Sequence, residues 1–326
     1  MNISKFIKIQ NNKKKLFTPG PGSLLSENIM GLQPCFGRGD EQYEKIENKV
    51  LNKLKKIPNH KFIVRMQGSA SLALEILIHN FLYGKVLIVD TGVYSDRIKN
   101  ISIFSKKIFK KIKSVKSIRW SQIDDFSNNF DWIFACPTET SIGLKLPIQN
   151  LYNLKKRCKG KLALDATASV GLEDDHHYSD VMAYSSCKGL LGLTGGSFIS
   201  YNKQPNNYIE SFYLNIFNHL EKKMTGPYHV ILSLDKVLSS YNDFKYSVII
   251  NKRKITKLMG NKMIYPKKNQ PLLCTYIKKK LLSKNKNVIF YKTRAKLKGS
   301  IICHLGETHL KRSSKGKILE SLYYAN

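Results

Sequence analysis

Val181-Met182-Ala183-Tyr184-Ser185-Ser186-Cys187-Lys188-Gly189 is an apolar run that ends in a small polar turn carrying a lysine. Upstream, the apolar run Leu162-Ala163-Leu164 ends in Asp165. Lys188 follows Asp165 by 23 residues, which leaves room for the loop and short helix that return a chain to a neighbouring strand. Because open α/β sheets gather their functional side chains at the carboxyl ends of the strands, we expect this amine and this carboxylate to lie on one edge of a sheet.

The region from residue 62 to residue 201 alternates short apolar runs with helical patterns. The runs that we expect to form strands are Phe62–Arg65, Val86–Val89, Trp132–Cys136, Lys161–Leu164, Val181–Tyr184 and Ser197–Tyr201. Ser71–Leu82 has apolar residues at helical spacing, and Leu151–Cys158 follows Pro147, as expected of two helices. The alternation predicts an α/β fold with a mostly parallel sheet flanked by helices.

The chain changes character near residue 241. From there it carries more lysine and shorter apolar runs, near residues 272–277, 287–291 and 300–305. We therefore predict a large domain at residues 17–240 and a smaller α+β domain at residues 241–326, completed by residues 1–16. A helix around Val230–Leu238 is expected to join the two.

The composition is strongly basic. The 326 residues include 55 Lys and Arg against 23 Asp and Glu, a net charge of +32, with 42% hydrophobic residues to build a core. Such a charge is typical of proteins that bind RNA, DNA or an anionic membrane surface. Lysine is scattered along the whole chain, however, so we predict a solvated basic surface that favours anionic substrates, and no nucleic-acid partner.

We predict neither a membrane span nor a signal peptide nor a metal site. No apolar stretch approaches the ~18 residues of a span, and residues 1–15 are rich in Lys and Asn. The six cysteines include no CxxC pair. His176-His177 could ligate a metal, but a polar loop is the better interpretation. We expect a cytoplasmic protein with free thiols.

The strand ends carry the groups that pyridoxal phosphate (PLP) requires. PLP chemistry needs a lysine that forms a Schiff base, a carboxylate that keeps the ring nitrogen protonated, N–H groups for the phosphate and an aromatic ring over the cofactor. Lys188 and Asp165 supply the first two. Gln67–Ser71 opens a helix, Tyr94 follows another strand, and Thr167 would share the direction of Asp165 if that strand continued. Each of these residues taken alone could also be an ordinary helix cap, turn residue or core residue. The prediction therefore depends on the order in which they follow successive strand ends along the chain.

Several motifs along the chain together resemble class V aminotransferases. They are Thr18-Pro19-Gly20-Pro21, Gly68-Ser69-Ala70-Ser71, Gly92-Val93-Tyr94, Glu139-Thr140-Ser141-Ile142-Gly143, Asp165-Ala166-Thr167-Ala168-Ser169, Ser185-Ser186-Cys187-Lys188-Gly189 and Thr225-Gly226-Pro227-Tyr228-His229. The resemblance covers roughly residues 17 to 240. It is closest to the branch of 2-aminoethylphosphonate–pyruvate transaminase and alanine–glyoxylate aminotransferase.

This resemblance implies PLP fold type I and a homodimer with active sites at the subunit interface. Lys188 would correspond to the Schiff-base lysine, Asp165 to the aspartate on the pyridine nitrogen, and Tyr94 to the stacking ring. The further cofactor contacts would be Ser69, Ala70 and Ser71 at the phosphate, Thr140 near the phenolic oxygen, Cys187 beside the lysine, and Thr225 at the phosphate of the partner subunit. Thr18–Pro21 would line the substrate side.

Three departures from the family pattern bear on cofactor and substrate. Cys187 stands where the family carries Gln, Asn or His, and a thiol is a poor hydrogen-bond donor. Residues 299–306 lack the arginine that the family uses to bind the substrate carboxylate, a role suited to a bidentate guanidinium. The candidate substitutes are Arg294, His304 and Arg312. The C-terminal domain is also short for the family.

We predict a PLP-dependent aminotransferase that moves an amino group from a small donor, with 2-aminoethylphosphonate as a candidate, to pyruvate or another 2-oxo acid. Two alternatives stay open: a class V lyase or other non-transaminase PLP enzyme, and a non-catalytic protein that binds nucleic acid on the same scaffold. Cys187 also suggests a cysteine desulfurase, but the nucleophile of those enzymes lies on a distant loop, which disfavours that class.

Overall fold

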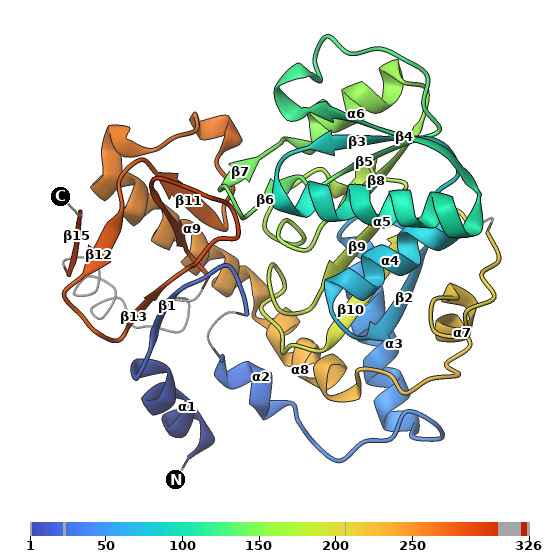
Figure 1. Ribbon diagram of the computed structural model, residues 1–326. Helices are drawn as coiled ribbons and strands as arrows, with labels where there is room; N and C mark the ends of the chain where they lie inside the picture. Colours follow the sequence, from blue (N-terminus) through green and yellow to red (C-terminus); the bar gives the residue numbers. More distant parts are fainter. Residues whose placement is uncertain (1, 22–23, 206, 306–320, 325–326) are drawn as a thin grey trace.

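A seven-stranded sheet forms the centre of the larger lobe (Figure 1). The computed structural model describes residues 2–21, 24–205, 207–305 and 321–324. Across the sheet the strands are, in order, β2 (Phe62–Gln67), β10 (Gly196–Tyr201), β9 (Val181–Ser185), β8 (Lys161–Asp165), β5 (Trp132–Ala135), β3 (Gly84–Asp90) and β4 (Ile112–Arg119). β10 is antiparallel to both of its neighbours, and all other adjacent pairs are parallel. The mostly parallel sheet predicted from the sequence is confirmed.

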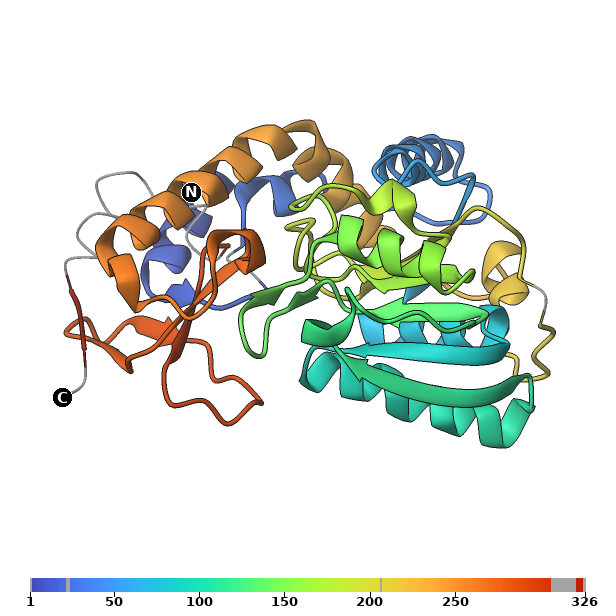
Figure 2. The same cartoon turned by 90° about the horizontal axis from the view of Figure 1, so that it is seen from above.

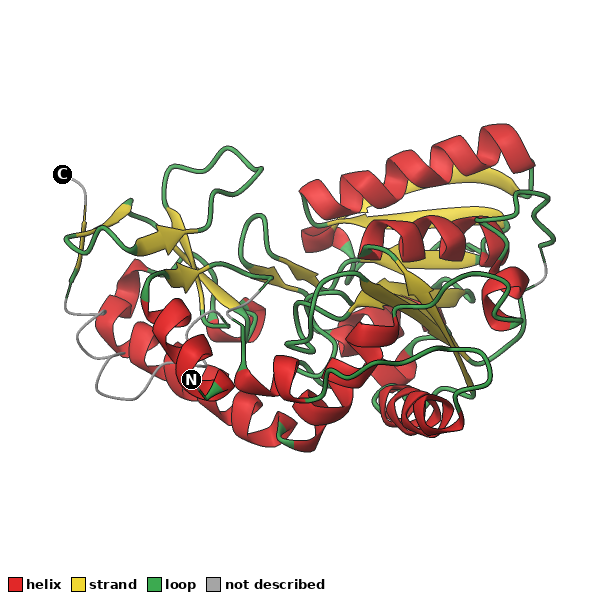
Figure 3. Ribbon diagram, turned by 90° about the horizontal axis from the view of Figure 1, so that it is seen from below, coloured by secondary structure: helices red, strands yellow, loops and turns green. Residues whose placement is uncertain are grey.

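Helices cover both faces of this sheet (Figures 2 and 3). The helices are α1 (Ile3–Asn12), α2 (Ser26–Met30), α3 (Glu41–Lys56), α4 (Ala70–Phe81), α5 (Val93–Phe109), α6 (Ile148–Arg157), α7 (Ile216–Leu220), α8 (Tyr228–Ser239) and α9 (Tyr241–Met259). α3, α6 and α8 pack on one face, and α4, α5 and α7 pack on the other. Along β3, Leu87 and Val89 enter the first core while Val86 and Ile88 enter the second. Because both faces are buried, inner strands such as β3 and β5 are nearly continuous apolar runs.

All six strands expected from the sequence form, but the elements that were missed include β4, α5 and α9. β4 is an edge strand that pairs only with β3, and its residues include the exposed Lys113 and Lys116. Charged side chains are usual on edge strands, where they discourage pairing with other chains. In β4 they interrupt the run of apolar residues by which a strand is recognised in a sequence. α9 follows α8 after the single residue Ser240, so the predicted connecting helix is only the first of two.

A second lobe contains short sheets packed against α9 (Figure 1). Its strand pairs are β11 (Cys274–Ile277) with β14 (Ser300–Cys303), β12 (Leu281–Ser283) with β15 (Leu322–Tyr324), and β1 (Lys15–Phe17) with β13 (Val288–Phe290). Phe17 stacks on Phe290, with ring centroids 5.7 Å apart. A further hairpin, β6 (Thr138–Glu139) with β7 (Leu144–Lys145), follows β5 of the large sheet.

The predicted domain boundary between residues 240 and 241 falls where α8 gives way to α9. The division into residues 17–240 and residues 241–326 with 1–16 stays a prediction. Within the described part of the chain, no helix combines the length and the apolar character that crossing a bilayer requires.

Candidate active site

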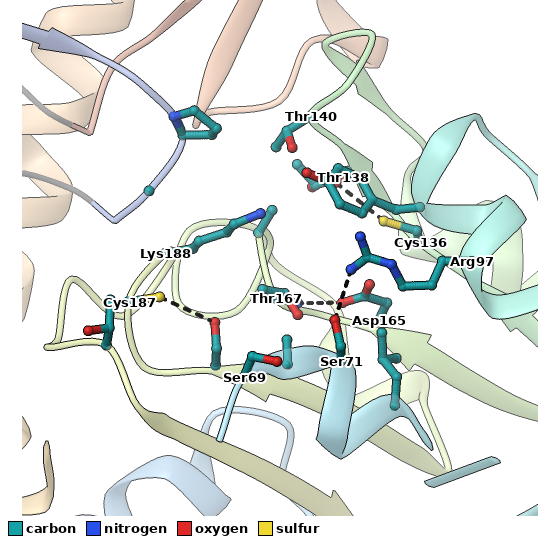
Figure 4. A pocket seen from close by; sticks show the side chains of 18 of the residues that line it. Ser69, Ser71, Arg97, Cys136, Thr138, Thr140, Asp165, Thr167, Cys187 and Lys188 are labelled. Atoms are coloured by element: carbon teal, nitrogen blue, oxygen red, sulfur yellow. Dashed lines mark hydrogen bonds between the residues drawn. The ribbon is translucent and has the colours of Figure 1, made fainter. Parts of the chain in front are cut away.

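A cavity of about 630 Å³ opens at the carboxyl ends of the parallel strands, beside the second lobe. Of the residues predicted to form a site, those that line it are Ser69, Ala70, Ser71, Tyr94, Thr140, Asp165, Thr167, Cys187 and Lys188. Pro19 and Gly20 of the N-terminal motif line it as well. The structure therefore gathers side chains from loops after β2, β3, β6, β8 and β9 around one space (Figure 4).

Lys188 extends into the cavity from the turn after β9 (Figure 4). Its Nζ lies 5.0 Å from the centroid of the Tyr94 ring, a cation–π distance. Gly20 lies against the lysine: a Cβ there would come within 2.7 Å of Lys188 Cγ, and the residue has φ +132°. Glycine at position 20 therefore leaves the lysine the room that a side chain would occupy.

Asp165 is the last residue of β8 and is only 5% exposed. Its Oδ1 accepts a hydrogen bond of 3.1 Å from the backbone N–H of Thr167. The strand thus ends before Thr167, so the condition under which the two side chains would share a strand direction is not met. The chain instead turns at Ala166, whose carbonyl accepts from the N–H of Val170, and this turn brings Thr167 to the cavity.

The Gly68–Ser71 segment forms the start of α4, as the sequence predicts. Ser69 is the N-cap residue, and its carbonyl accepts from the N–H groups of Leu72 and Ala73. The N–H groups of a first helical turn carry partial positive charge and bind anions well. Since Ser69, Ala70 and Ser71 all line the cavity, this helix start presents an anion-binding surface to it.

Tyr94 is held in place by a buried carboxylate. Its backbone N–H donates to Oε2 of Glu139 at 2.9 Å, and Glu139 is fully buried in the β6–β7 hairpin. Gly92, with φ +136°, makes the turn before α5, and a Cβ there would lie 3.2 Å from Glu139 Cγ. Burial raises the pKa of Glu139, and hydrogen bonds from Ser141 and the Tyr94 N–H offset only part of the rise. Glu139 thus links the hairpin to the start of α5.

Arg97 also lines the cavity, and our reading of the sequence missed it. It donates to Ser71 Oγ at 3.0 Å (Figure 4). Its Cζ lies 5.2 Å from the centroid of the Tyr94 ring. The signal was present in the sequence, because residues three apart on a helix share a face and Arg97 is three residues after Tyr94. The helix itself, however, had not been predicted there.

Thr225 does not line the cavity in this single chain; it is exposed, in the segment before α8. Cys187 does line it, and its Sγ lies 3.8 Å from Ser185 Oγ. His176 lies elsewhere, buried, with its Nε2 2.9 Å from Ser169 Oγ. Among the residues described here, no group of three or more His, Cys, Asp or Glu side chains is arranged to hold a metal ion.

Of the three substitutes for the family arginine, Arg294 lines the cavity. His304 does not: it is 1% exposed, its Nε2 lies 3.0 Å from Thr275 Oγ1, and burial lowers its pKa to about 3. A neutral, enclosed imidazole cannot bind a carboxylate in the cavity, so His304 was a wrong candidate. Arg312 lies outside the described residues.

Arg294 enters with two neighbours, Tyr291 and Lys292, on the connection from β13 to β14. The hydroxyl of Tyr291 lies 3.5 Å from that of Tyr94. Burial and the nearby Tyr94 raise the pKa of Tyr291, which keeps the phenol protonated. The second lobe thus supplies one wall of the cavity.

The polar groups of the cavity fit PLP. Within the described chain, the hydroxyls of Thr138 and Thr167 are buried and have no hydrogen-bond partner, and both residues line the cavity. Buried hydroxyls without partners are costly, so they indicate a place where a ligand completes the structure. An amine, a carboxylate, a helix start and an aromatic ring surround the same space.

The fold is that of PLP fold type I enzymes, the group that includes class V aminotransferases. A solved structure of alanine–glyoxylate aminotransferase from Nostoc sp. superimposes with a TM-score of 0.78 at 15% identity, over 94% of this chain and 94% of that one. This confirms the predicted fold class.

Curated relatives agree with the resemblance to aminotransferases. An uncharacterized aminotransferase of Methanocaldococcus jannaschii is 26% identical over 261 residues, which are 72% of this chain and 66% of the relative, just under two thirds of its length. A 2-aminoethylphosphonate–pyruvate transaminase of Pseudomonas aeruginosa is 24% identical over 255 residues, 70% of this chain and 68% of the relative. No family model matches the chain. The similarity in sequence and fold to aminotransferases is confirmed.

Proposed function

We propose that the protein is a PLP-dependent aminotransferase. The observation that carries this proposal is the meeting of Lys188, Asp165 and the start of α4 in one cavity of a chain with the PLP fold type I architecture. When bound, PLP would supply an electron sink for the substrate carbon that bears the amino group. Lys188 would hold the cofactor covalently and move the proton at that carbon, and the Asp165 carboxylate would keep the pyridine nitrogen protonated.

The other cavity residues would hold the cofactor. The N–H groups of Ser69, Ala70 and Ser71 are suited to the phosphate, and the Tyr94 ring, which already lies near Lys188 Nζ, is suited to stacking. The unpartnered hydroxyl of Thr167 would contact the cofactor from the Asp165 side. Thr140 and Cys187 would complete the pocket as the family resemblance implies.

The donor that we propose is a small amine such as 2-aminoethylphosphonate, with pyruvate or another 2-oxo acid as acceptor. The support is the similarity to relatives named 2-aminoethylphosphonate–pyruvate transaminase. We also propose a homodimer in which Thr225 reaches the phosphate in the partner subunit, since Thr225 is exposed and lies away from the cavity of its own chain. A cytoplasmic location stays a prediction.

PLP uptake tests the cofactor proposal. The purified protein is incubated with PLP and reduced with borohydride, and the modified peptide is located by mass spectrometry. We expect the modification on Lys188, its loss in Lys188→Ala, and its retention in Lys203→Ala, which alters an exposed lysine away from the cavity. A wild-type protein that stays unmodified, or a modification elsewhere, would refute the proposal.

The reaction type is tested by supplying an amine without any oxo acid. A transaminase stops after one equivalent of carbonyl product, because its cofactor is left in the amino form, and it resumes when pyruvate is added. A lyase continues without an acceptor. Continued turnover would therefore replace the aminotransferase proposal with the lyase alternative.

A further inference from the structure

A second cavity, which we call the aromatic cavity, lies at the opposite edge of the large sheet from the cofactor cavity. It has a volume of about 230 Å³ and is lined mainly by Phe81, Tyr83, Trp132, Lys161, Asp180 and residues 202–205. Trp132 and Lys161 are the first residues of β5 and β8, whose carboxyl ends lead instead to Cys136 and Asp165 in the cofactor cavity. A parallel strand rises about 3.3 Å per residue, so the two ends of β8 lie about 13 Å apart. Among the described residues, none lines both cavities.

Aromatic rings and one lysine form the inner wall of the aromatic cavity. Tyr83 and Trp132 meet edge to face, with ring centroids 6.2 Å apart and an interplanar angle of 83°. Lys161 Nζ lies 5.1 Å from the centroid of the Tyr83 ring and 5.3 Å from that of Trp132, which are cation–π distances. The same Nζ donates to the Tyr83 hydroxyl at 3.0 Å. These contacts hold the ammonium group of Lys161 beside both rings.

Two polar groups of this wall are donors that lack an acceptor. Trp132 is only 3% exposed, and its Nε1–H has no hydrogen-bond partner within the described chain. The Tyr83 hydroxyl accepts from Lys161, so its own hydrogen is left to donate. A buried donor without an acceptor costs free energy, so it indicates a place where a ligand completes the structure.

The charges of the aromatic cavity also favour an anion. Lys161 and Lys203 both line it, and neither forms an ion pair with a carboxylate in the part of the chain that the structure describes. Asp180 lines it too, but this carboxylate is already paired with Lys155 Nζ at 2.6 Å and accepts from the Leu162 N–H at 2.7 Å. The two lysines therefore lack a counter-charge inside the cavity.

We propose that the aromatic cavity binds a small carboxylic acid as its anion. The carboxylate would accept from Lys161, from the Trp132 Nε1–H and from the Tyr83 hydroxyl, since its two oxygens offer enough acceptor sites for all three donors. The apolar body of the ligand would lie against the aromatic rings. At about 30 Å³ for each water-sized group, the volume holds about eight non-hydrogen atoms, the size of a carboxylate on a five-membered ring. This site goes beyond the proposed function and does not depend on it.

Calorimetric titration of the PLP-loaded protein with 2-furoate tests the ligand class. 2-Furamide has the same shape without the charge, and inorganic phosphate has the charge without an apolar body. We expect 2-furoate to bind at least about tenfold more tightly than either, because it alone combines charge-assisted hydrogen bonds with apolar burial. Equal binding of 2-furamide or of phosphate would overturn the assignment to a carboxylic acid.

Variants assign the binding to one cavity. Lys161→Met is expected to weaken 2-furoate binding about 10- to 100-fold, and Tyr83→Phe about three- to tenfold, because each removes a donor. Lys85→Met is the matched control, since Lys85 is exposed on the neighbouring strand β3 and lines neither cavity. Arg294→Gln alters the cofactor cavity and should leave the affinity unchanged. Loss of binding in Arg294→Gln, or unchanged binding in Lys161→Met, would overturn the inference.

The indole N–H signals in an NMR spectrum give a second measurement that a purely structural role of Trp132 would not change. The chain has two tryptophans, Trp120 and Trp132, and Trp120→Phe assigns their signals. At saturating 2-furoate we expect the Trp132 signal to move downfield as its N–H gains an acceptor, and the Trp120 signal to stay, since Trp120 lines neither cavity. A Trp132 signal that does not move would overturn the inference. Failure of PLP to modify Lys188 would overturn only the proposed function, because the aromatic cavity shares no described residue with the cofactor cavity.

Discussion

Replacing Glu47 with glutamine should destabilise the protein severely at neutral pH. Glu47 lies on α3 and is 1% exposed, and it is the centre of a buried ionic cluster. Its Oε1 accepts from Arg65 Nε at 2.9 Å and from the Tyr43 hydroxyl at 2.9 Å, while its Oε2 lies 2.7 Å from Lys222 Nζ. The cluster fixes β2 and the segment that leads to Thr225.

The size of the effect follows from the burial of the partner. Arg65 is only 5% exposed, so Glu47→Gln leaves a buried guanidinium without its counter-charge. Removing one member of a buried pair costs about 3–5 kcal/mol, because the remaining charge cannot be rehydrated. Lys222 is 39% exposed and regains water, so it adds little.

The difference between wild type and variant should depend on pH. Burial acts to raise the pKa of Glu47, but Lys222 and Arg65 outweigh it and hold the pKa below its ordinary value of 4.5. A carboxyl with a lowered pKa in the folded state stabilises the protein above the unfolded-state pKa, and this contribution is lost as the pH falls through the folded-state pKa. The stability gap should therefore be full at pH 7 and should narrow below about pH 4.5.

The assay is urea unfolding followed by the fluorescence of Trp120 and Trp132, at neutral and at acid pH. The control is Glu221→Gln, which breaks the exposed pair with Lys223 and should cost less than about 1 kcal/mol. If Glu47→Gln unfolded at the same urea concentration as Glu221→Gln at pH 7, the stability assigned to the buried pair of Glu47 and Arg65 would be wrong.

Three further variants probe the cavity. Gly20→Ala should lower borohydride-trapped PLP, because the new Cβ would meet Lys188 Cγ at 2.7 Å in a backbone conformation unsuited to alanine; unchanged trapping would contradict this. Glu139→Gln should weaken PLP affinity about three- to tenfold in a fluorescence titration, because the single amide oxygen cannot accept from both the Tyr94 N–H and the Ser141 N–H, which now donate to the two carboxylate oxygens. Thr138→Val should not destabilise the protein without PLP and could stabilise it by up to about 1 kcal/mol, because the Thr138 hydroxyl has no hydrogen-bond partner in the described chain. The same variant should lower PLP affinity about fivefold. An unchanged PLP affinity would show that Thr138 does not contact the cofactor.

Much of the site could be anticipated because its signals are local. Asp165 ends one apolar run and Lys188 lies in the turn after another, and a parallel sheet with both faces covered turns such runs into buried strands whose ends meet. Ser69 caps α4 for the same local reason, since a small polar residue before an apolar helical stretch starts a helix. These predictions needed no knowledge of distant contacts.

Other predictions failed where a local rule met a tertiary constraint. Thr167 reaches the cavity through a turn at the end of β8 and not by strand alternation, because Asp165 accepts its N–H and ends the strand. His304 looked available in the sequence, but the packing of β14 buries it against Thr275 and holds it neutral. The edge strand β4 was not predicted because its lysines and arginine interrupt the apolar pattern that is typical of a strand.

The sequence by itself determined which polar residues follow each strand. It therefore determined that the Lys188 amine, the Asp165 carboxylate and the start of α4 lie at a common edge of the sheet. Only the tertiary structure decided which other cations join them. Arg97 arrives because α5 packs beside α4, and Lys292 and Arg294 arrive because Thr293 and Tyr291 fasten the second lobe to residues 141 and 94. The physical reason is the separation along the chain between the residues that interact. Strand ends and helix caps are set by neighbouring residues. The second-lobe wall of the cavity depends on how the two lobes pack, because its contacts join residues about 150 to 200 positions apart.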